Sequence, residues 1–205
     1  MTSCILLVRH GETEWNRQRR YQGRSDSPLT ERGIAQAQSI GRLLGVLLPD
    51  TTSANIVSSP LGRAWCTAKI IRQHLPGLPE LRVDDRLREL SLGTWDGLTY
   101  REIATRSPGV FDGNGRHEWY FRAPCGERYE TFSARLNEWL CAAAEAGPLI
   151  VVTHGVVTRV LRGLYAKLSR EAALILPVPQ DRIFRLAGGK IEEIAVPNQS
   201  AEGRG

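Results

Sequence analysis

Two short apolar segments, far apart in the sequence, each end in a histidine that is followed by a glycine. Residues 5–11 read ILLVRHG, and residues 149–155 read LIVVTHG. Uninterrupted apolar runs of this length are typical of strands that are buried on both faces, as in a parallel sheet. The carboxyl ends of such strands are where open α/β sheets bind their ligands. The sequence therefore predicts that His10 and His154 share one pocket at an edge of the sheet.

Helical and strand-like segments alternate along the chain. Thr30 is an expected N-cap for a helix over 31–48, and the Ser59-Pro60 pair predicts a helix from there to about residue 74. Further helices are expected at 99–107, 129–147 and 156–168, strands at 4–9, 54–57, 81–83 and 149–153, a closing hairpin at 182–186 and 190–194, and an irregular loop at 108–126. This alternation predicts a three-layer α/β/α sandwich with a mainly parallel central sheet.

Length and composition fit a single domain. The chain has 205 residues, 41% hydrophobic and 24% charged, so one core is expected over residues 1–197. The polar residues 198–205 predict a disordered tail. No apolar stretch is long enough for a membrane span, and the first strand begins too early for a signal peptide to precede it. Four scattered cysteines without a C-x-x-C pair indicate reduced thiols and a cytoplasmic location.

The net charge of +5 raises the hypothesis of a nucleic-acid partner. The arginines are dispersed, however, and the densest group, Arg17, Arg19, Arg20 and Arg24, follows the first histidine. This placement favours an anionic small molecule, so we expect neither a nucleic-acid nor a membrane partner. The sequence leaves a homodimer open.

Several segments, in order along the chain, resemble the motifs of one enzyme family. Residues 9–16 read RHGETEWN and resemble the signature of the histidine phosphatase superfamily, also called the phosphoglycerate mutase-like family. Residues 21–33, 58–64 and 88–97 resemble the segment after this signature, the second-arginine motif and the acid loop. The resemblance runs from residue 4 to about residue 165. It implies a phosphoglycerate mutase-like fold and phosphoryl chemistry without a metal or other cofactor.

Hydrolysis of a phosphomonoester needs a nucleophile, compensation for the phosphoryl charge and a proton for the leaving oxygen. A neutral imidazole at His10 can attack phosphorus through one ring nitrogen while the other donates a hydrogen bond. Arg9 and Arg63 can bind phosphate oxygens through paired N–H groups, and His154 can supply a further donor. The family resemblance implies a phosphohistidine on His10, which water then cleaves.

The expected substrate-binding set extends beyond these four residues. The resemblance implies that Asn16 also contacts the phosphoryl oxygens and that Gln22 and Gly23 form the rim of the pocket. Gly155, directly after the second histidine, completes the set.

Glu89 is the candidate general acid, because it lies in the segment that resembles the acid loop. The other branch of the superfamily tends to place an aspartate directly after its second histidine. Here that histidine is followed by Gly155 and Val156, which favours Glu89. Glu12 and Asp96 stay open as nearby rivals.

The remaining histidines and aromatic residues allow other interpretations. Flanking arginines and the lack of an HxH or HExxH pattern argue against a metal site. His74 and His117 lie outside the motifs and are expected at the surface. The aromatic residues 119–121 either line a leaving-group pocket or anchor their loop, and the sequence leaves both roles open.

The favoured function is a cofactor-independent phosphomonoesterase acting on a small phosphorylated metabolite. The alternative is a cofactor-dependent phosphoglycerate mutase, although that class carries a longer, basic insertion than the segment between Glu89 and His154 allows. A third class is a phospho-ligand binding module without catalytic activity. It is disfavoured because the candidate nucleophile, the phosphate-binding arginines and the candidate acid are all present. Sugar phosphates, phosphoglycerate derivatives and α-ribazole phosphate all stay open as substrates, since the leaving-group contacts would come from the loop-rich region 98–128.

Overall fold

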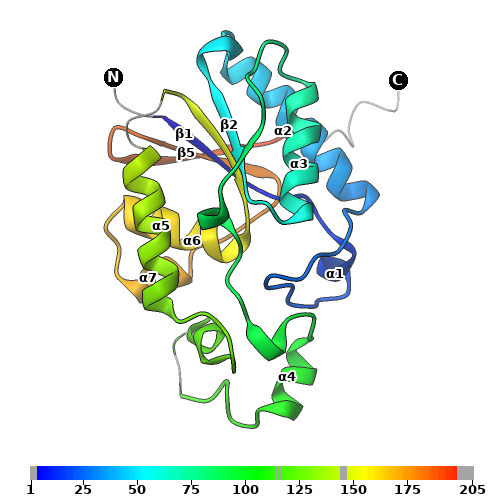
Figure 1. Cartoon of the computed structure of the whole chain (residues 1–205), viewed down its shortest axis with the longest axis vertical. Helices are drawn as coiled ribbons and strands as arrows, with labels where there is room; N and C mark the ends of the chain where they lie inside the picture. Colours follow the sequence, from blue (N-terminus) through cyan, green and yellow to red (C-terminus); the bar gives the residue numbers. More distant parts are fainter. Residues whose placement is uncertain (1–3, 114, 116, 144–146, 198–205) are drawn as a thin grey trace.

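A six-stranded sheet forms the centre of the molecule. The computed structural model describes residues 4–113, 115, 117–143 and 147–197. The strand order is β3-β2-β4-β1-β5-β6. The first four strands in this order are parallel, β5 pairs antiparallel with β1, and β6 pairs antiparallel with β5. The strands are β1 (Ile5–Arg9), β2 (Asn55–Ser58), β3 (Arg82–Val83), β4 (Leu149–Thr153), β5 (Arg182–Ala187) and β6 (Lys190–Ala195). The expected three-layer sandwich with a mainly parallel sheet is confirmed (Figure 1).

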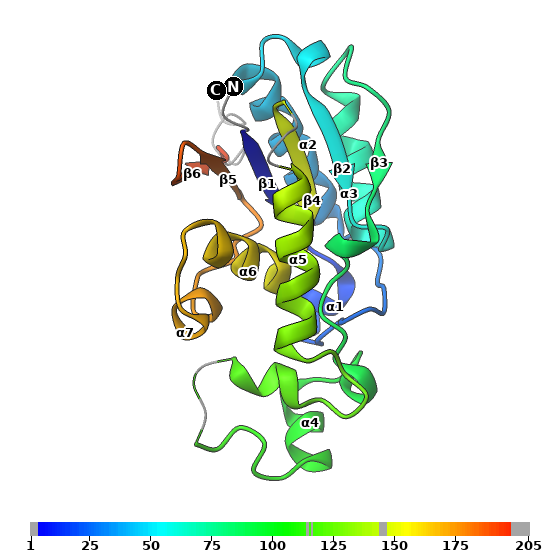
Figure 2. The same cartoon turned by 60° about the vertical axis from the view of Figure 1, so that its left-hand side comes forward.

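Two helices cover one face of the sheet, α2 (Glu31–Leu47) and α3 (Gly62–Gln73) (Figure 2). Successive side chains of a strand point to opposite faces, so Leu6 and Val8 of β1 both belong to the layer beneath these helices. There they pack in one apolar cluster with Ile40 of α2. The apolar residues at helical spacing over 31–48 therefore pack on this face of the sheet and bury it.

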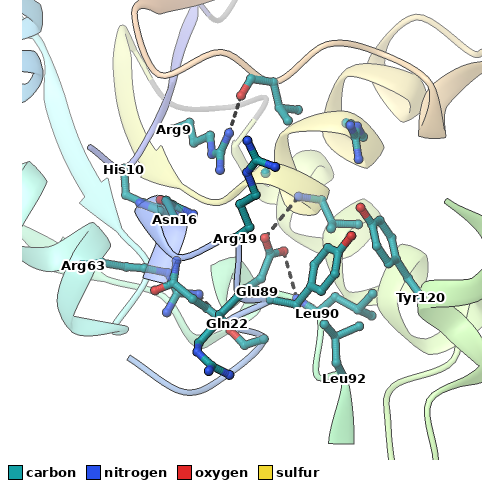
Figure 3. Close-up of a pocket in the computed structure, with 17 residues that line it drawn as sticks. Arg9, His10, Asn16, Arg19, Gln22, Arg63, Glu89, Leu90, Leu92 and Tyr120 are labelled. Carbon is teal, nitrogen blue, oxygen red and sulfur yellow. Dashed lines mark hydrogen bonds between the residues drawn. The ribbon is translucent and has the colours of Figure 1, made fainter. Parts of the chain in front are cut away.

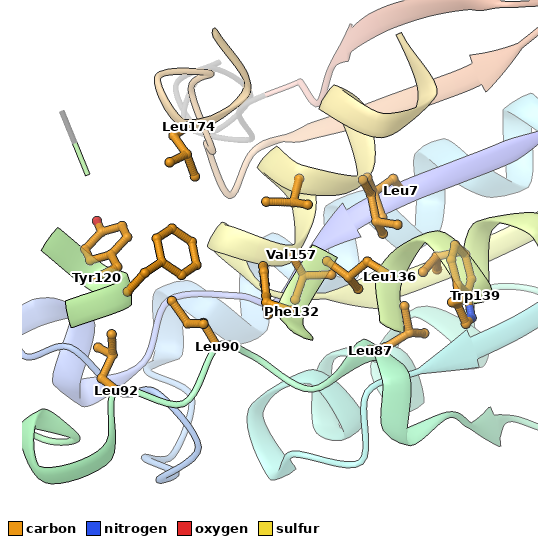
Figure 4. Close-up of a cluster of buried hydrophobic side chains, with 14 of the residues drawn as sticks. Leu7, Leu87, Leu90, Leu92, Tyr120, Phe132, Leu136, Trp139, Val157 and Leu174 are labelled. Carbon is orange, nitrogen blue, oxygen red and sulfur yellow. The ribbon is translucent and has the colours of Figure 1, made fainter. Parts of the chain in front are cut away.

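The opposite face is covered by α5 (Tyr129–Ala143) and α6 (Gly155–Tyr165), with the short α7 (Arg170–Leu174) against α6. Leu7 of β1 points into this second layer and joins a cluster that includes Phe132 (Figure 4). Each large side chain buried in this way contributes roughly 1.5–3 kcal/mol to the stability of the fold. Both faces of β1 and β4 are thereby buried.

The register of β1 and β4 aligns the two histidine segments. The strands run parallel with Arg9 beside Thr153, and the His10 amide donates a 2.8 Å hydrogen bond to the Thr153 carbonyl. The next residues along the two strands, His10 and His154, therefore leave the sheet side by side. The structure confirms that they meet at its carboxyl edge.

A smaller lobe extends beyond this edge. It contains α4 (Tyr100–Arg106) and a 3-10 turn at Glu118–Arg122, while α1 (Glu14–Arg17) lies between it and the sheet (Figures 1 and 2). Three further 3-10 turns lie at Thr51–Ser53, Asp85–Leu87 and Gly93–Trp95. Trp119 of the lobe belongs to the same apolar cluster as Phe132 of α5, so the lobe is continuous with the core.

The expected start of α3 at Ser59 and Pro60 was wrong. The helix begins at Gly62, and the Asp26 carboxylate, from a distant loop, accepts the amide hydrogens of Gly62 and Arg63. An acidic side chain at this position satisfies orphan donors and complements the helix dipole. Because the cap comes from another part of the chain, local spacing could not reveal it.

Other differences are smaller. Helices α1 and α7 were not expected, and the 108–126 loop contains a 3-10 turn. Helix α5 ends at Ala143, and the expected continuation to 147 and the tail 198–205 involve residues outside the described set. Within the described residues, no helix combines the length and the hydropathy that crossing a membrane would require.

Candidate active site

A cavity of about 290 Å³ opens at the carboxyl edge of the sheet (Figure 3). The sequence-predicted residues that line it are Arg9, His10, Asn16, Gln22, Gly23, Arg63, Glu89 and Gly155. His154 does not line the cavity itself but lies directly behind His10. The topology thus gathers residues from both halves of the chain around one hollow.

His10 is held as a neutral base. Its Nδ1 lies 2.8 Å from the Gly11 carbonyl oxygen, which can only accept, so Nδ1 carries the proton. In the neutral ring, the lone pair then resides on Nε2. Burial, and after it the charges of Arg63 and Arg9, hold the pKa of His10 well below its usual value of 6.5. The ring is therefore neutral at pH 7, and its Nε2 lone pair is able to act as a nucleophile.

His154 is fully buried, with its ring centroid 5.3 Å from that of His10. Its Nε2 lies 2.7 Å from the Ser59 hydroxyl, and its Nδ1 has no hydrogen-bond partner among the described residues. Burial, followed by the charge of Arg63, also lowers the pKa of His154 well below the usual value. When the Ser59 hydroxyl donates to Nε2, the neutral ring carries its proton on Nδ1 and has one donor to offer.

Residues 176–180, which lead into β5, form a strap along the cavity. The Val178 carbonyl accepts a 2.5 Å hydrogen bond from Arg9. The two preceding carbonyl groups accept hydrogen bonds from Arg159 and Arg162 of α6. The strap therefore ties the guanidinium at the end of β1 to the helix that follows β4.

Arg9 remains a cation in this setting. Burial lowers its pKa to about 10, and the nearby Glu89 carboxylate opposes that shift. The guanidinium is therefore protonated at pH 7. Its fork can bind an anion through N–H groups that the strap leaves unused.

Arg63 is the second buried cation of the site, with its side chain 1% exposed. One terminal nitrogen donates to the Ser25 carbonyl at 2.6 Å and to Asp26 at 2.9 Å, and the other donates to the Gly23 carbonyl at 2.8 Å. Burial lowers the pKa of Arg63, against the opposing charges of Glu89 and Asp26. Its loop partners fix the guanidinium in one orientation beside the cavity.

Buried polar atoms without partners are concentrated at this site. Among the described residues, the buried side-chain nitrogen and oxygen atoms that lack a hydrogen bond are Arg9 Nε, Gln22 Oε1, Arg63 Nε and His154 Nδ1. Buried polar groups are otherwise nearly always hydrogen-bonded. Because all four belong to predicted site residues, this concentration points to a polar ligand.

Asn16 is oriented by a residue that the sequence analysis missed. Its side-chain oxygen accepts hydrogen bonds from the Thr13 amide at 3.2 Å and from Gln180 Nε2 at 3.1 Å. Gln180, at the end of the strap, also donates to the His10 carbonyl at 3.1 Å. With its oxygen occupied, Asn16 has its NH₂ group left to donate to a ligand.

Gly23 meets a steric requirement at the rim. Its φ is +53°, and an added Cβ would lie 1.7 Å from a carboxylate oxygen of Asp96. Asp96 in turn accepts hydrogen bonds from the backbone amides of Arg24 and Leu92. This rival of Glu89 therefore organises the rim and does not line the cavity. The other rival, Glu12, accepts a hydrogen bond from Thr30 and also lies outside the lining.

Glu89 lies in the loop after the 3-10 turn at Asp85–Leu87, and its carboxylate reaches the amino end of α6. Its carboxylate accepts hydrogen bonds from the backbone amides of Val156 at 3.2 Å, Val157 at 3.4 Å and Leu90 at 2.9 Å (Figure 3). The carboxyl group of Glu89 therefore lies between Arg9 and Arg63 on one side and the outer wall of the cavity on the other (Figure 3).

The outer wall of the cavity combines aromatic and cationic side chains. It includes Tyr21, Leu92, Tyr120, Arg19 and Arg159. Of the aromatic residues 119–121, only the tyrosine lines the cavity, and its two neighbours are buried in the core, so both roles left open by the sequence are present.

The two histidines outside the motifs, His74 and His117, are both half-buried, so each keeps part of its side chain at the surface. His117 stacks on the Tyr120 ring at 5.2 Å between centroids, and so supports the cavity wall from behind.

The sequence analysis did not assign four further residues to the site, namely Ser59, Val178, Gln180 and Arg159. Ser59 lies inside the second-arginine segment, where it could have been noticed. The strap residues carry no local signal, because an apolar segment with two prolines gives no indication of which carbonyls an arginine will reach.

Comparison with known proteins identifies the family. The model of the histidine phosphatase superfamily (branch 1) matches residues 5–188. The chain belongs to this superfamily, as the resemblance of its motifs indicated.

Individual relatives differ in name. A Salmonella paratyphi C protein named probable phosphoglycerate mutase GpmB is 40% identical over 202 residues, which is 93% of this chain and 83% of that protein. The structure of Bacillus stearothermophilus YhfR is similar with a TM-score of 0.76 and 34% identity, covering 94% of this chain and 96% of that one. A mycobacterial glucosyl-3-phosphoglycerate phosphatase in complex with VO3 is similar with a TM-score of 0.73 and 30% identity, covering 94% and 97%. The relatives support a phosphatase or a mutase.

Proposed function

We propose that this protein is a phosphomonoesterase that hydrolyses a small phosphorylated metabolite through a phosphohistidine on His10. The observation that carries the proposal is the state of this ring. His10 is neutral, has its lone pair on Nε2, and lies in a cavity with two buried guanidinium groups. A nucleophile beside a fixed positive clamp is what phosphoryl transfer requires.

The proposed first step transfers the phosphoryl group to the enzyme. His10 Nε2 forms a bond to phosphorus as the bond from phosphorus to the ester oxygen breaks. Arg9 and Arg63 balance the charge on the phosphoryl oxygens, with Asn16 donating a further hydrogen bond. Glu89 gives a proton to the leaving oxygen, so the alcohol departs neutral.

The second step returns the enzyme to its starting state. Glu89, now a carboxylate, takes a proton from water as the water oxygen attacks phosphorus. The bond between phosphorus and His10 breaks, and inorganic phosphate leaves. No metal takes part in this scheme, so we expect hydrolysis to persist after exhaustive treatment with EDTA.

A phosphoglycerate mutase is the second candidate, favoured by the name of the relative that is 40% identical. Hydrolysis is favoured by the likeness to a phosphatase of known structure and by the short segment between Glu89 and His154. A mutase must shield its phosphohistidine from water until the product has turned around. A short segment offers little chain for such shielding.

The test measures phosphate release across a panel of phosphorylated metabolites, with 3-phosphoglycerate among them. In a parallel reaction, 2-phosphoglycerate is followed with and without 2,3-bisphosphoglycerate. We expect phosphate release and little isomerisation. Rapid isomerisation that depends on 2,3-bisphosphoglycerate, with little phosphate released, would establish the mutase instead. The cytoplasmic location and the absence of nucleic-acid, membrane and cofactor partners stay predictions.

A further inference from the structure

We propose that Arg135 and Glu127 are positioning residues that place the carboxyl group of Glu89 for proton transfer to the leaving oxygen. Neither residue lines the cavity. They act through the backbone of residues 86–91, the segment that carries Glu89. This inference rests on the proposed function, because it concerns the acid of that reaction.

The backbone around Glu89 is not held by secondary structure of its own. Residues 88–92 lie between the 3-10 turns at Asp85–Leu87 and Gly93–Trp95 and belong to no helix or strand. A general acid must stay within hydrogen-bond reach of the oxygen that it protonates. The groups that fix this segment must therefore come from other elements of the fold.

Arg135 of α5 binds the segment at two points. One of its terminal nitrogens donates to the Arg86 carbonyl, and the other donates to the Glu89 carbonyl at 3.4 Å. A guanidinium presents its donors in one rigid plane, so it fixes these two carbonyl groups relative to each other. Because the second contact is on the backbone of the acid itself, a movement of Arg135 would move Glu89.

Glu127, which lies just before α5, holds the guanidinium of Arg135. Its carboxylate accepts hydrogen bonds from Arg135 Nε at 2.8 Å and, at 2.9 Å, from the terminal nitrogen that also faces Glu89. The two side chains are only 15% and 8% exposed, so the pair is shielded from water. The Glu127 amide also donates to the Ser91 carbonyl at 2.9 Å. This two-point ion pair leaves the guanidinium one orientation.

Apolar packing holds the same segment against α5. Leu87 and Leu90, on either side of Glu89, are buried in one cluster with Phe132 and Leu136 (Figure 4). Residues 132, 135 and 136 lie on one face of the helix, so Arg135 belongs to the face that makes this contact. Apolar contacts are not directional, whereas hydrogen bonds to two carbonyl groups are. Packing therefore brings the segment to α5, and the arginine sets its orientation.

Glu127 also connects this arrangement to the rim of the cavity. Its carboxylate lies 3.5 Å from a terminal nitrogen of Arg24. Arg24 follows Gly23, whose carbonyl accepts a hydrogen bond from Arg63. The pair thus lies between the segment that carries the acid and the loop that orients a phosphate-binding arginine. Both parts of the site are held relative to the same helix.

Two substrates that differ in their leaving group test the proposal. Phenyl phosphate has a more basic leaving oxygen than p-nitrophenyl phosphate, so its reaction depends more on the acid. Arg135→Met keeps an apolar stem over the Phe132 ring and removes the donors. A displacement of about 1 Å can cost about 10²-fold in rate. We expect kcat/KM to fall about tenfold further for phenyl phosphate than for p-nitrophenyl phosphate. Equal losses on the two substrates would overturn the proposal.

Two milder variants guard against loss of the fold. Arg135→Lys keeps the charge but cannot reach both carbonyl groups and the carboxylate at once, so its ratio of kcat/KM should fall less than that of Arg135→Met. Glu127→Gln keeps the shape and weakens the hold on the guanidinium, and should shift the ratio in the same direction. An unchanged ratio in both folded variants would contradict the proposal.

Arg170→Met is the matched control. Arg170 also pairs with a glutamate, Glu118, at 2.5 Å and lies over a ring of α5, that of Tyr129, at 4.1 Å. Its hydrogen bonds go to Glu118 and Glu130, away from residues 86–91. The ratio of kcat/KM should therefore stay unchanged. A fall equal to that of Arg135→Met would show a general effect of lost packing and contradict the proposal.

A double variant tests whether Arg135 acts through the acid. In a Glu89→Gln background the carboxyl group is absent, so Arg135→Met should change the ratio of kcat/KM little further. A full additional fall in this background would show that Arg135 affects leaving-group departure by another route, and the proposal would fail.

Hydrogen exchange separates this inference from the proposed hydrolysis. The Val156 and Val157 amides donate to the Glu89 carboxylate and, in the first turn of α6, have no acceptor within the helix. NMR should show their exchange to be about tenfold faster in Arg135→Met, the effect of about one lost hydrogen bond, and unchanged in Arg170→Met.

The two readouts fail separately. If exchange becomes faster in Arg135→Met but the natural protein hydrolyses none of the panel, Arg135 positions Glu89 and the proposed hydrolysis fails. If Glu89→Gln shows the leaving-group effect while Arg135→Met changes neither the ratio nor the exchange, the positioning role fails and the proposed function stands.

Discussion

The two strand-histidine-glycine segments are alike in sequence and differ in what surrounds their rings. His10 lines the cavity, and its Nδ1–H donates a hydrogen bond to the Gly11 carbonyl. His154 lies behind it, with Nε2 on Ser59 and Nδ1 unpartnered among the described residues. His10 is left with a lone pair on Nε2, and His154, when the Ser59 hydroxyl donates to its Nε2, is left with a proton on Nδ1.

The difference arises from the structure that comes directly after each strand. After β1 the chain turns into a loop, and the His10 ring bonds to that loop's own backbone. After β4 the chain enters α6 at once, and the first amides of this helix hold Glu89. The β1 end thus supplies the nucleophile of the proposed reaction, while the β4 end supplies a donor and positions the acid. Similar local sequences acquire different chemistry from their partners.

The largest expected effect separates the two rings. His10→Ala should lower kcat by roughly 10⁴-fold or more, because the nucleophile is lost. His154→Ala should cost about 10²–10³-fold, the typical loss for one donor to the transition state. Steady-state kinetics with p-nitrophenyl phosphate would measure both, with circular dichroism to check the fold. A folded His10→Ala protein with near-normal turnover would break the comparison.

The next effect tests the acid that the β4 end positions. Glu89→Gln should reduce hydrolysis of alkyl phosphates by about 10²–10⁴-fold, the usual range for general acid catalysis. Turnover of p-nitrophenyl phosphate should fall less, because its leaving oxygen needs little protonation. Asp96→Asn is the control for the rejected acid, and it should affect both substrates to the same degree. Equal losses on both substrates for Glu89→Gln would mean that this carboxyl does not protonate the leaving group.

A smaller effect concerns the orientation of His154. Ser59→Ala removes the partner of Nε2 and should lower kcat/KM about 3–10-fold, the contribution of one neutral hydrogen bond. In a His154→Ala background the same change should add little further loss, because the two residues act together. Fully independent losses in this double-mutant cycle would show that Ser59 acts elsewhere.

The smallest effect is on stability and concerns both rings. Folding keeps His10 and His154 neutral, while the unfolded chain protonates them below about pH 6.5, so the unfolded state binds more protons there. The free energy of unfolding should therefore fall as the pH drops from 7 to 5.5, by roughly 1 kcal/mol for each ring. Urea unfolding should show a smaller fall for His10→Gln and for His154→Gln than for the natural chain. Unchanged pH dependence in both variants would contradict the buried neutral rings.

The sequence revealed the parts of the site that lie on or beside the strands. Apolar runs marked β1 and β4, and parallel pairing then brought His10 and His154 together without further information. Arg9 was also found, because it stands at the strand end, and Gly23 was found through the family resemblance, while its positive φ became known only from the structure.

The parts that the sequence did not reveal depend on contacts between distant segments. Asp26 caps α3 from across a loop, and Gln180 reaches back to Asn16 and His10 from the other end of the chain. Such contacts follow from the packed arrangement of elements and not from residue spacing. Arg159 was likewise hidden, because its role depends on the strap carbonyl that receives it.

The most direct test of the account is to locate the phosphoryl group on the enzyme. The protein is mixed with ³²P-labelled p-nitrophenyl phosphate, quenched in alkali within milliseconds, and mapped by peptide mass spectrometry, with ³¹P NMR to distinguish the two ring nitrogens. We predict acid-labile phosphate on His10, attached to Nε2, because Nδ1 is occupied by the Gly11 carbonyl. Phosphate on His154, or on Nδ1 of His10, or steady turnover without any labelled histidine, would contradict the central claim that surroundings make His10 the nucleophile.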